Sequence, residues 1–146
     1  MLRQFLVGGG ISMINIAIHA LIMTTVVGVA RAASAKNRSH HSLFLIAVMI
    51  PTVSVLMLTH ALEVVVWALA YSIVHAAPPG TDLVYFAFVN YATLGYGDVV
   101  PVVGWRLLGP ITAMNGALMF GWSTAVIFEV LRRTLERSSK LSREKS

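Results

Sequence analysis

The sequence contains no cysteine, which excludes a disulfide framework and a zinc site built from thiolates. Charge is also scarce, since Asp, Glu, Lys and Arg make up only 12% of the chain, about half of what a soluble domain carries. Apolar residues reach 57%, and they gather in runs of about twenty or more, the length that crosses a bilayer. These features predict a multi-pass protein embedded in a lipid bilayer.

Acidic residues are fewer than basic ones, six against eleven, and the net charge of +5 raises the question of a nucleic-acid partner. Nine of the eleven Lys and Arg lie in only two stretches, residues 30–42 and 132–146. Basic stretches next to apolar spans mark the cytoplasmic side of a membrane. We therefore expect no nucleic-acid partner. No stretch repeats arginine at every third position, which excludes a voltage sensor of the kind that moves charge through the field.

Three stretches are long and apolar enough to span the membrane, residues 5–29, 43–75 and 107–131. The polar residues 30–42 are expected to form a cytoplasmic linker. A signal peptide is a rival interpretation of the first stretch, but its apolar run exceeds the roughly 7–15 residues of such a peptide's core. The glycines at positions 8–10 are expected to let another helix approach closely. Trp67 and Tyr71 are expected at the outer membrane interface.

Residues 82–92 form a fourth apolar stretch that is too short to span, about 16 Å at helical rise. Thr81 or Asp82 is expected to cap its N-terminus. Three aromatic residues in this stretch, Tyr85, Phe86 and Phe88, are expected to pack against neighbouring helices.

The stretch 93–98 follows, with the sequence Thr-Leu-Gly-Tyr-Gly-Asp. Its two glycines allow positive φ, so the backbone can turn its carbonyls where other residues cannot. A dehydrated monovalent cation needs rings of such oxygens in place of its water. With an apolar helix before it and another after it, the motif resembles the filter of the potassium-channel pore family, usually TVGYGD, with Leu94 in place of valine.

The resemblance implies an all-α membrane protein with three transmembrane helices, a re-entrant pore helix and a selectivity-filter loop. Residues 1–42 are then an additional N-terminal helix and linker, 43–132 the pore domain and 133–146 a basic cytoplasmic tail. Irregular backbone at membrane depth must be buried in protein or line water. Because the chain carries one such loop and no repeat, we expect a homotetramer that closes the pore around an axis.

The resemblance also implies residue roles. The carbonyls of Thr93, Leu94, Gly95 and Tyr96 are expected to bind the permeant K⁺, with Gly97 completing the filter. The Tyr96 side chain is expected to brace the filter against the pore helix, and Asp98 to lie at the outer mouth and attract cations. In many family members the counterpart of Asp98 is hydrogen-bonded to an acidic residue behind the filter. This chain has Val89 at that position, so the bond is expected to be absent.

The last span is expected to supply the cavity and the gate. Counting from Arg106, Gly116 falls at the position of the family's hinge glycine. Phe120, or residues nearer Glu129, are expected to form a hydrophobic constriction. Asn115 has two interpretations of equal weight, cavity lining or a bond to a neighbouring helix. The expected cavity stripe has helical spacing and comprises Asn115, Gly116, Met119, Phe120, Ser123, Thr124 and Ile127.

Three ionisable residues, His19, His60 and Glu63, are placed near mid-membrane. Such residues usually face protein or water and have partners. Either they join the first two spans by hydrogen bonds, which we favour, or they sense protons, because histidine titrates near neutral pH.

The sequence thus predicts a potassium-selective channel that conducts passively and is not an enzyme. It is expected in the plasma or inner membrane, with the N-terminus outside and the C-terminus in the cytoplasm. In build it resembles small bacterial two-helix channels with one more helix. Two alternatives stay open: a less selective monovalent cation channel, and a non-conducting subunit that regulates a partner.

Overall fold

The computed structural model describes residues 1–36 and 41–143, and the side chains of residues 1–29 and 45–136. The described residues are helical and contain no strand. Three helices are long and apolar enough to cross a membrane, which confirms the predicted fold class. The elements are α1 (Leu2–Lys36), α2 (His41–Val74), α3 (Leu83–Tyr91), the short 3-10 helix η1 (Val103–Trp105) and α4 (Leu108–Arg143).

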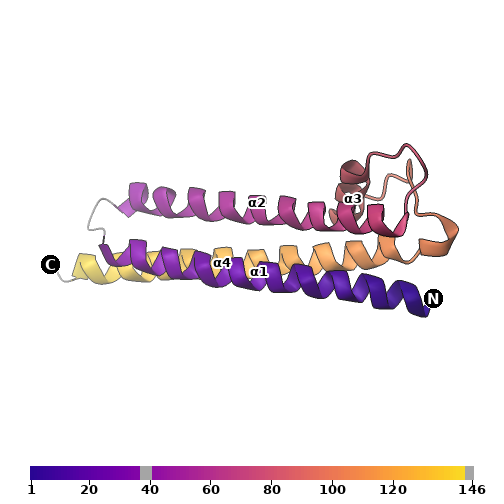
Figure 1. Ribbon diagram of the computed structural model, residues 1–146. Coiled ribbons are helices and arrows are strands. Elements are labelled where there is room, and N and C mark those ends of the chain that lie inside the picture. The colour runs from indigo at the N-terminus through magenta and orange to yellow at the C-terminus, as the bar shows by residue number, and fades with distance from the viewer. Residues whose placement is uncertain (37–40, 144–146) are drawn as a thin grey trace.

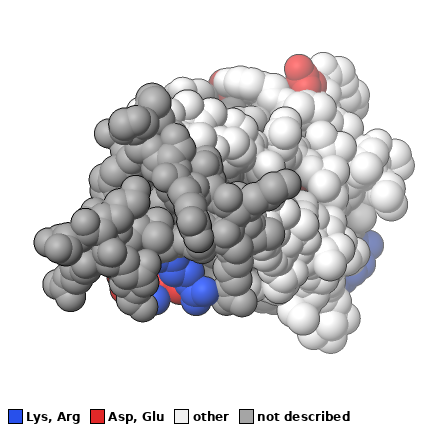
Figure 2. All heavy atoms as spheres, turned by 90° about the vertical axis from the view of Figure 1, so that its left-hand side faces the viewer, with Lys and Arg blue, Asp and Glu red and all other residues white. Residues whose placement is uncertain are grey.

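The three long helices lie side by side, and α3 packs at one end of them (Figure 1). The N-terminus lies at the same end as α3, while the end of α1, the start of α2 and the end of α4 lie at the opposite end. Figure 2 looks at that opposite end, where basic and acidic side chains are visible. The linker and tail therefore share one side, as the charge argument requires. Which side of a membrane this is stays a prediction.

The predicted cytoplasmic linker at residues 30–42 is wrong in its extent. Helix α1 continues to Lys36 and α2 begins at His41, so only residues 37–40 of this stretch lie outside the described ones. The physical reason is composition, since residues 30–36 hold four alanines with an arginine and a lysine, which are strong helix formers. Helix α4 likewise runs past the predicted end at 131 to Arg143.

Ion pairs support this longer α4 helix. Glu129 pairs with Arg132 at 2.9 Å and also with Arg133, and Arg132 pairs in turn with Glu136 at 2.7 Å. These partners are three or four residues apart and so lie on one helix face. Residues 144–146, the end of the predicted tail, lie outside the described residues.

The interfacial position predicted for Trp67 and Tyr71 is also wrong, because both side chains are fully buried. The Tyr71 ring packs on Phe86 of α3, with 4.9 Å between centroids. The Tyr71 hydroxyl lies 2.6 Å from the Thr112 hydroxyl of α4. Both aromatic residues belong to the part of α2 that faces α3 and α4, so their polar atoms bond to protein rather than to lipid headgroups.

Helix α1 packs closely against the start of α4. A Cβ added to Gly8 would lie 2.9 Å from two Ile111 side-chain atoms, which confirms the predicted close approach at this glycine. Gln4 Oε1 accepts a hydrogen bond from the Leu107 backbone N–H at 2.9 Å. The Arg3 guanidinium lies 4.3 Å from the centre of the Trp105 ring, a cation–π geometry. The first turns of α1 are thus fixed to the entry of α4.

Gly116 of α4 lies against the end of α3. A Cβ added there would lie 2.0 Å from the Tyr91 carbonyl oxygen, a separation that no real Cβ can adopt. The absence of a side chain is therefore what lets the end of α3 rest on α4. This packing role was not predicted from the sequence, and the hinge role stays a prediction.

We predict that Gly116→Ala destabilises the protein by about 1–3 kcal/mol, the usual cost of overpacking. Gly121→Ala is the matched control, because a Cβ there meets no described atom within 4 Å. The control should be neutral or stabilising by up to about 1 kcal/mol through helix propensity. Unfolding by denaturant in detergent measures both, and equal stabilities of the two variants would contradict the packing argument.

Candidate functional site

Helix α3 begins at a side-chain cap. Asp82 Oδ1 accepts hydrogen bonds from the backbone N–H groups of Val84 at 3.0 Å and Tyr85 at 3.1 Å. This confirms Asp82 as the N-cap. The carboxylate satisfies two of the N–H groups that the first turn of a helix leaves free.

The other end of α3 leads directly into the 93–98 loop. Thr93 N–H donates to Asn90 C=O and Leu94 N–H to Val89 C=O, each at 3.0 Å. With Thr93 at a φ of 59°, these bonds form a Schellman motif, which satisfies the last carbonyls of a helix. A threonine occupies the position where glycine is usual. The loop therefore starts from a closed helix end rather than from frayed backbone.

The backbone alternates along this loop. Thr93, Gly95 and Gly97 have φ values of 59°, 58° and 79°, whereas Leu94 and Tyr96 between them are not in the left-handed region. A Cβ added to either glycine meets no described atom within 4 Å. The two glycines are therefore required by backbone conformation and not by crowding.

The side chains of the loop project away from the rest of the chain. Leu94 is 51% and Tyr96 68% exposed. The bracing of Tyr96 against the pore helix is therefore not made within one chain. It requires a neighbouring copy, and it stays a prediction.

Asp98 has a partner that the sequence argument missed. The Tyr85 hydroxyl donates a hydrogen bond to Asp98 Oδ2 at 2.7 Å, although Tyr85 was expected only to pack. Val89, the position that the resemblance pointed to, is buried. The spacing of 13 residues across a helix and a loop carries no periodic signal, so the sequence alone did not reveal this bond.

The predicted cavity stripe on α4 is partly wrong. Asn115 is only 2% exposed, and its Oδ1 accepts hydrogen bonds from Asn15 Nδ2 at 3.1 Å and Trp67 Nε1 at 3.0 Å. Of its two interpretations, the bond between helices is the one observed. Met119 and Ser123 are buried as well. The stripe fails because the same helical spacing describes the face of α4 that packs on α1, α2 and α3.

Other members of that stripe stay accessible. Thr124 is exposed, and its hydroxyl donates to the Phe120 carbonyl at 2.9 Å. Phe120 is 39% exposed. Its ring centre lies 4.6 Å from that of His60 and 5.4 Å from that of Tyr91. Ile127 is half-buried. The exposed face of α4 passes through Gly121, Thr124 and Phe128, so Thr124 is the polar side chain of the stripe that remains open.

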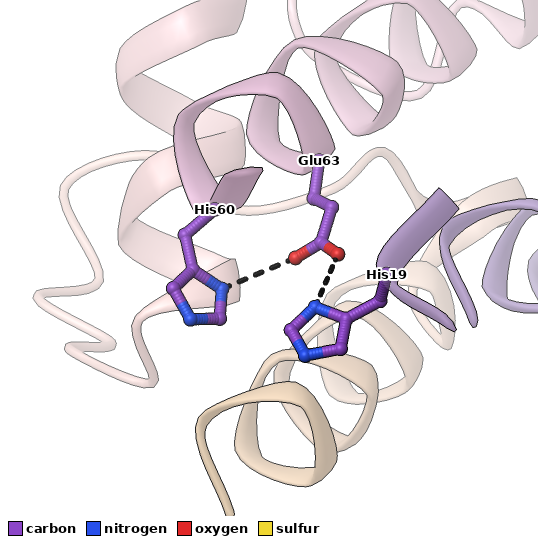
Figure 3. A group of neighbouring side chains, drawn as sticks. All are labelled: His19, His60 and Glu63. Carbon is purple, nitrogen blue, oxygen red and sulfur yellow. Dashed lines mark hydrogen bonds and ion pairs between the residues drawn. The ribbon is translucent and has the colours of Figure 1, made fainter. Parts of the chain in front are cut away.

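The structure brings His19, His60 and Glu63 together between α1 and α2 (Figure 3). His19 Nδ1 lies 2.8 Å from one carboxylate oxygen of Glu63, and His60 Nδ1 lies 3.1 Å from the other. Glu63 and His19 are fully buried. The predicted bonds between the first two spans are therefore present.

Two further residues, which the sequence argument did not assign to this cluster, join it to α3 and α4. The Tyr91 hydroxyl donates to Glu63 Oε2, and Ser123 Oγ lies 3.0 Å from His60 Nε2 and 3.4 Å from His19 Nε2. Residues from all four α-helices thus meet in one polar cluster, in which Ser123 of α4 contacts the two histidines. Tyr91 is the last residue of α3 and comes two positions before Thr93.

A comparison with known protein families identifies the family of this chain. Residues 55–133, from the middle of α2 to the C-terminal half of α4, match the model of a family described as "Ion channel". The match covers more than half of the chain. This chain belongs to that ion-channel family. No curated protein and no solved structure matches the chain. The matched residues of the channel include α3, the 93–98 loop, Glu63 and Tyr91, but not α1.

We predict that the Asp98 carboxylate controls the titration of Tyr85. The hydrogen bond to Asp98 stabilises the protonated phenol and raises the pKa of Tyr85 above its usual value. Asp98→Asn should therefore lower the pKa of Tyr85 toward the ordinary tyrosine value of about 10. The measurement is ultraviolet absorbance against pH, with the spectrum of Tyr85→Phe subtracted. Asp82→Asn is the matched control, and a Tyr85 pKa that responds equally to both would contradict the bond.

Proposed function

We propose that the protein is a potassium-selective channel that conducts K⁺ passively as a homotetramer. The observation that carries this proposal is the alternating backbone of the Thr-Leu-Gly-Tyr-Gly-Asp loop, with positive φ at Thr93, Gly95 and Gly97. Membership of an ion-channel family supports conduction in general. The proposed selectivity for K⁺ over other cations rests on this loop.

Residues with positive φ that alternate with residues of negative φ turn successive peptide planes in the same sense. Successive carbonyl oxygens can then point to one side of the strand, unlike those of a β-strand. A row of such oxygens replaces the water of a dehydrated K⁺ ion. We assign these oxygens to Thr93, Leu94, Gly95 and Tyr96, with Gly97 allowing the chain to leave the filter.

The exposure of the loop supports assembly around an axis. All six residues from 93 to 98 are exposed in one chain, and irregular backbone is tolerated at membrane depth only inside protein or beside water. Phe88 of α3 is also half exposed. Four copies would cover these surfaces and close the ring of oxygens, whereas one copy supplies only one wall.

Charge supports one orientation in the cell membrane. The basic C-terminal part of α4 and the end of α1, which carries Arg31 and Lys36, share one end (Figure 1), and such an end faces the cytoplasm. Asp98 then lies at the outer mouth with the N-terminus outside. Thr124 faces the inner cavity, and Phe120 or Phe128, beside Glu129, narrows the pathway. In the same arrangement Gly116 is a bending point of α4 only if the contact with Tyr91 is released.

We predict that Gly95→Ala abolishes K⁺ flux, because alanine strains the left-handed conformation by roughly 1–2 kcal/mol in every copy. Gly104→Ala is the matched control, since Gly104 has no positive φ and a Cβ there meets no described atom within 4 Å. Purified protein in liposomes, loaded with K⁺ and assayed by an ion-sensitive dye, measures both variants. Flux that survives Gly95→Ala would refute the filter assignment.

The same liposomes separate the alternatives. Reversal potentials in mixed K⁺ and Na⁺ should follow the K⁺ gradient. Equal permeability would instead indicate the less selective cation channel. The differences that would account for it are Leu94 and Ala92, which depart from the usual filter sequence and alter its packing. A complete lack of flux from the unmodified protein would favour a non-conducting subunit.

We also predict a tetramer in lipid nanodiscs or mild detergent. Native mass spectrometry should give four chains per particle, because the 93–98 loop must be covered on all sides. A monomer or dimer that still conducts K⁺ would refute the proposed pore.

A further inference from the structure

The polar cluster behind α3 forms a closed ring of contacts. The two Nδ1 atoms of His19 and His60 face the two oxygens of Glu63, at 2.8 and 3.1 Å. The two Nε2 atoms both face Ser123 Oγ, at 3.4 and 3.0 Å respectively. The ring thus has four contacts. The Tyr91 hydroxyl lies outside it, donates to Glu63 Oε2 and is also 3.0 Å from His60 Nδ1.

Each contact in the ring needs one hydrogen atom. Two neutral imidazoles supply one each and the Ser123 hydroxyl supplies one, which gives three hydrogens for the four contacts. Both Nδ1 atoms must carry theirs, because an ionised carboxylate only accepts. The Tyr91 oxygen also lies 3.0 Å from His60 Nδ1, but the one phenol hydrogen is donated to Glu63, so it supplies none to that nitrogen. The serine hydroxyl then donates to one Nε2, and the other Nε2 faces the serine oxygen with no hydrogen between them. The longest contact of the ring, 3.4 Å, is the one at His19.

The charge of the ring also indicates an additional proton at His19 Nε2. The described ion-pair partners of Glu63 are His19 and His60. With both histidines neutral, the ring has a net charge of −1 among apolar helices, and an unpaired buried charge is costly. One more proton at His19 Nε2 supplies the missing hydrogen and makes an imidazolium–carboxylate pair with no net charge.

The polar groups that face the Glu63 carboxylate or the two imidazoles come from all four α-helices. Helix α1 contributes His19, α2 contributes His60 and Glu63, α3 contributes the Tyr91 phenol, and α4 contributes the Ser123 hydroxyl. Trp122 of α4 covers His19, with 5.2 Å between ring centres, and it is not titratable.

We propose that the ring of His19, Glu63, His60 and Ser123 binds one proton per chain, and that this proton fastens α1 to the helices that carry the filter. The bound proton can move between the two histidines through the Ser123 hydroxyl, which accepts from one Nε2 while donating to the other. When the proton leaves, His19 loses its bond to α4 and the carboxylate loses its counter-charge. The Tyr91 hydroxyl carries this change to the end of α3, two residues before Thr93.

A metal ion is the rival occupant, because ligand atoms of His19, His60 and Glu63 lie within 4.8 Å of one another. Ligands at about 2.0–2.1 Å from a tetrahedral Zn²⁺ are roughly 3.3–3.4 Å apart. The observed N–O separations of 2.8 and 3.1 Å are shorter than this, and the one at His19 has the length of a charge-assisted hydrogen bond, about 2.7–2.9 Å. The geometry therefore favours a proton.

The test is ¹⁵N NMR of the full chain in lipid nanodiscs, with ¹⁵N-labelled histidine. Replacing His40, His41 and His75 by glutamine leaves only His19 and His60 of the five histidines as reporters. At pH 7.5, where a solvated histidine with a pKa of about 6.5 is neutral, half of the imidazole signal should come from imidazolium. Two neutral imidazoles at this pH would overturn the proposal.

Variants locate the proton. Glu63→Gln should leave both histidines neutral at pH 7.5, because the counter-charge is gone. Ser123→Ala should give a smaller imidazolium signal than the parent at pH 7.5, since it removes the partner of both Nε2 atoms. Thr124→Ala, an exposed neighbouring hydroxyl outside the ring, should leave the spectrum unchanged. Should Glu63→Gln fail to fold, the Ser123→Ala and Thr124→Ala pair still decides, and equal imidazolium signals in these two would overturn the proposal.

A spectrum that changes on adding a chelator would identify a metal as the occupant and would also overturn the proposal. None of these measurements requires ion flux, so the proton site and the K⁺ channel can each fail without the other.

Discussion

A polar group inside a membrane must find its partner within the protein, and this constraint organises the structure. Helix α3 ends against α4, and its last residue, Tyr91, is buried. The Schellman motif at Thr93 satisfies part of that end, and the contact with Gly116 brings α4 directly against the Tyr91 carbonyl. The loop that follows is therefore held at a fixed position by its first residues, although its own side chains are exposed.

The same constraint explains the buried side chains. Individual hydrogen bonds between membrane helices contribute only about 0.6 kcal/mol on average. Removing one member of a buried ion pair costs about 3–5 kcal/mol, because a charge is left without compensation. Glu63 is bonded to His19, His60 and Tyr91. Losing one of the charged partners would therefore destabilise the fold by more than the hydrogen bonds themselves contribute to its stability.

The features predicted correctly from sequence are those with a local signal. Span length and apolar content predicted three helices, and the carboxylate before an apolar run predicted the Asp82 cap. The linker between α1 and α2 was predicted too long because residues 30–42 were taken as loop, whereas the alanines of 30–36 continue the helix. The helical ion pairs expected between Glu129 and the two arginines after it are present. The faces of α4 could not be assigned, since a helical stripe such as Asn115, Met119 and Ser123 looks the same whether it faces a cavity or another helix. Bonds between distant segments, such as Tyr85 to Asp98, had no sequence signal at all.

Helix α1 lies outside the matched family region, yet it completes the polar interactions inside that region. Asn15 of α1 donates to Asn115 Oδ1 of α4 and to the Glu63 backbone carbonyl of α2. His19, one turn further along α1, supplies the shorter of the two histidine contacts of the Glu63 carboxylate. Without α1, Glu63 would keep His60 and Tyr91 but would face lipid where His19 now lies. A buried carboxylate on the second span therefore makes the first span a necessary part of the fold, and not an appendage to the pore helices.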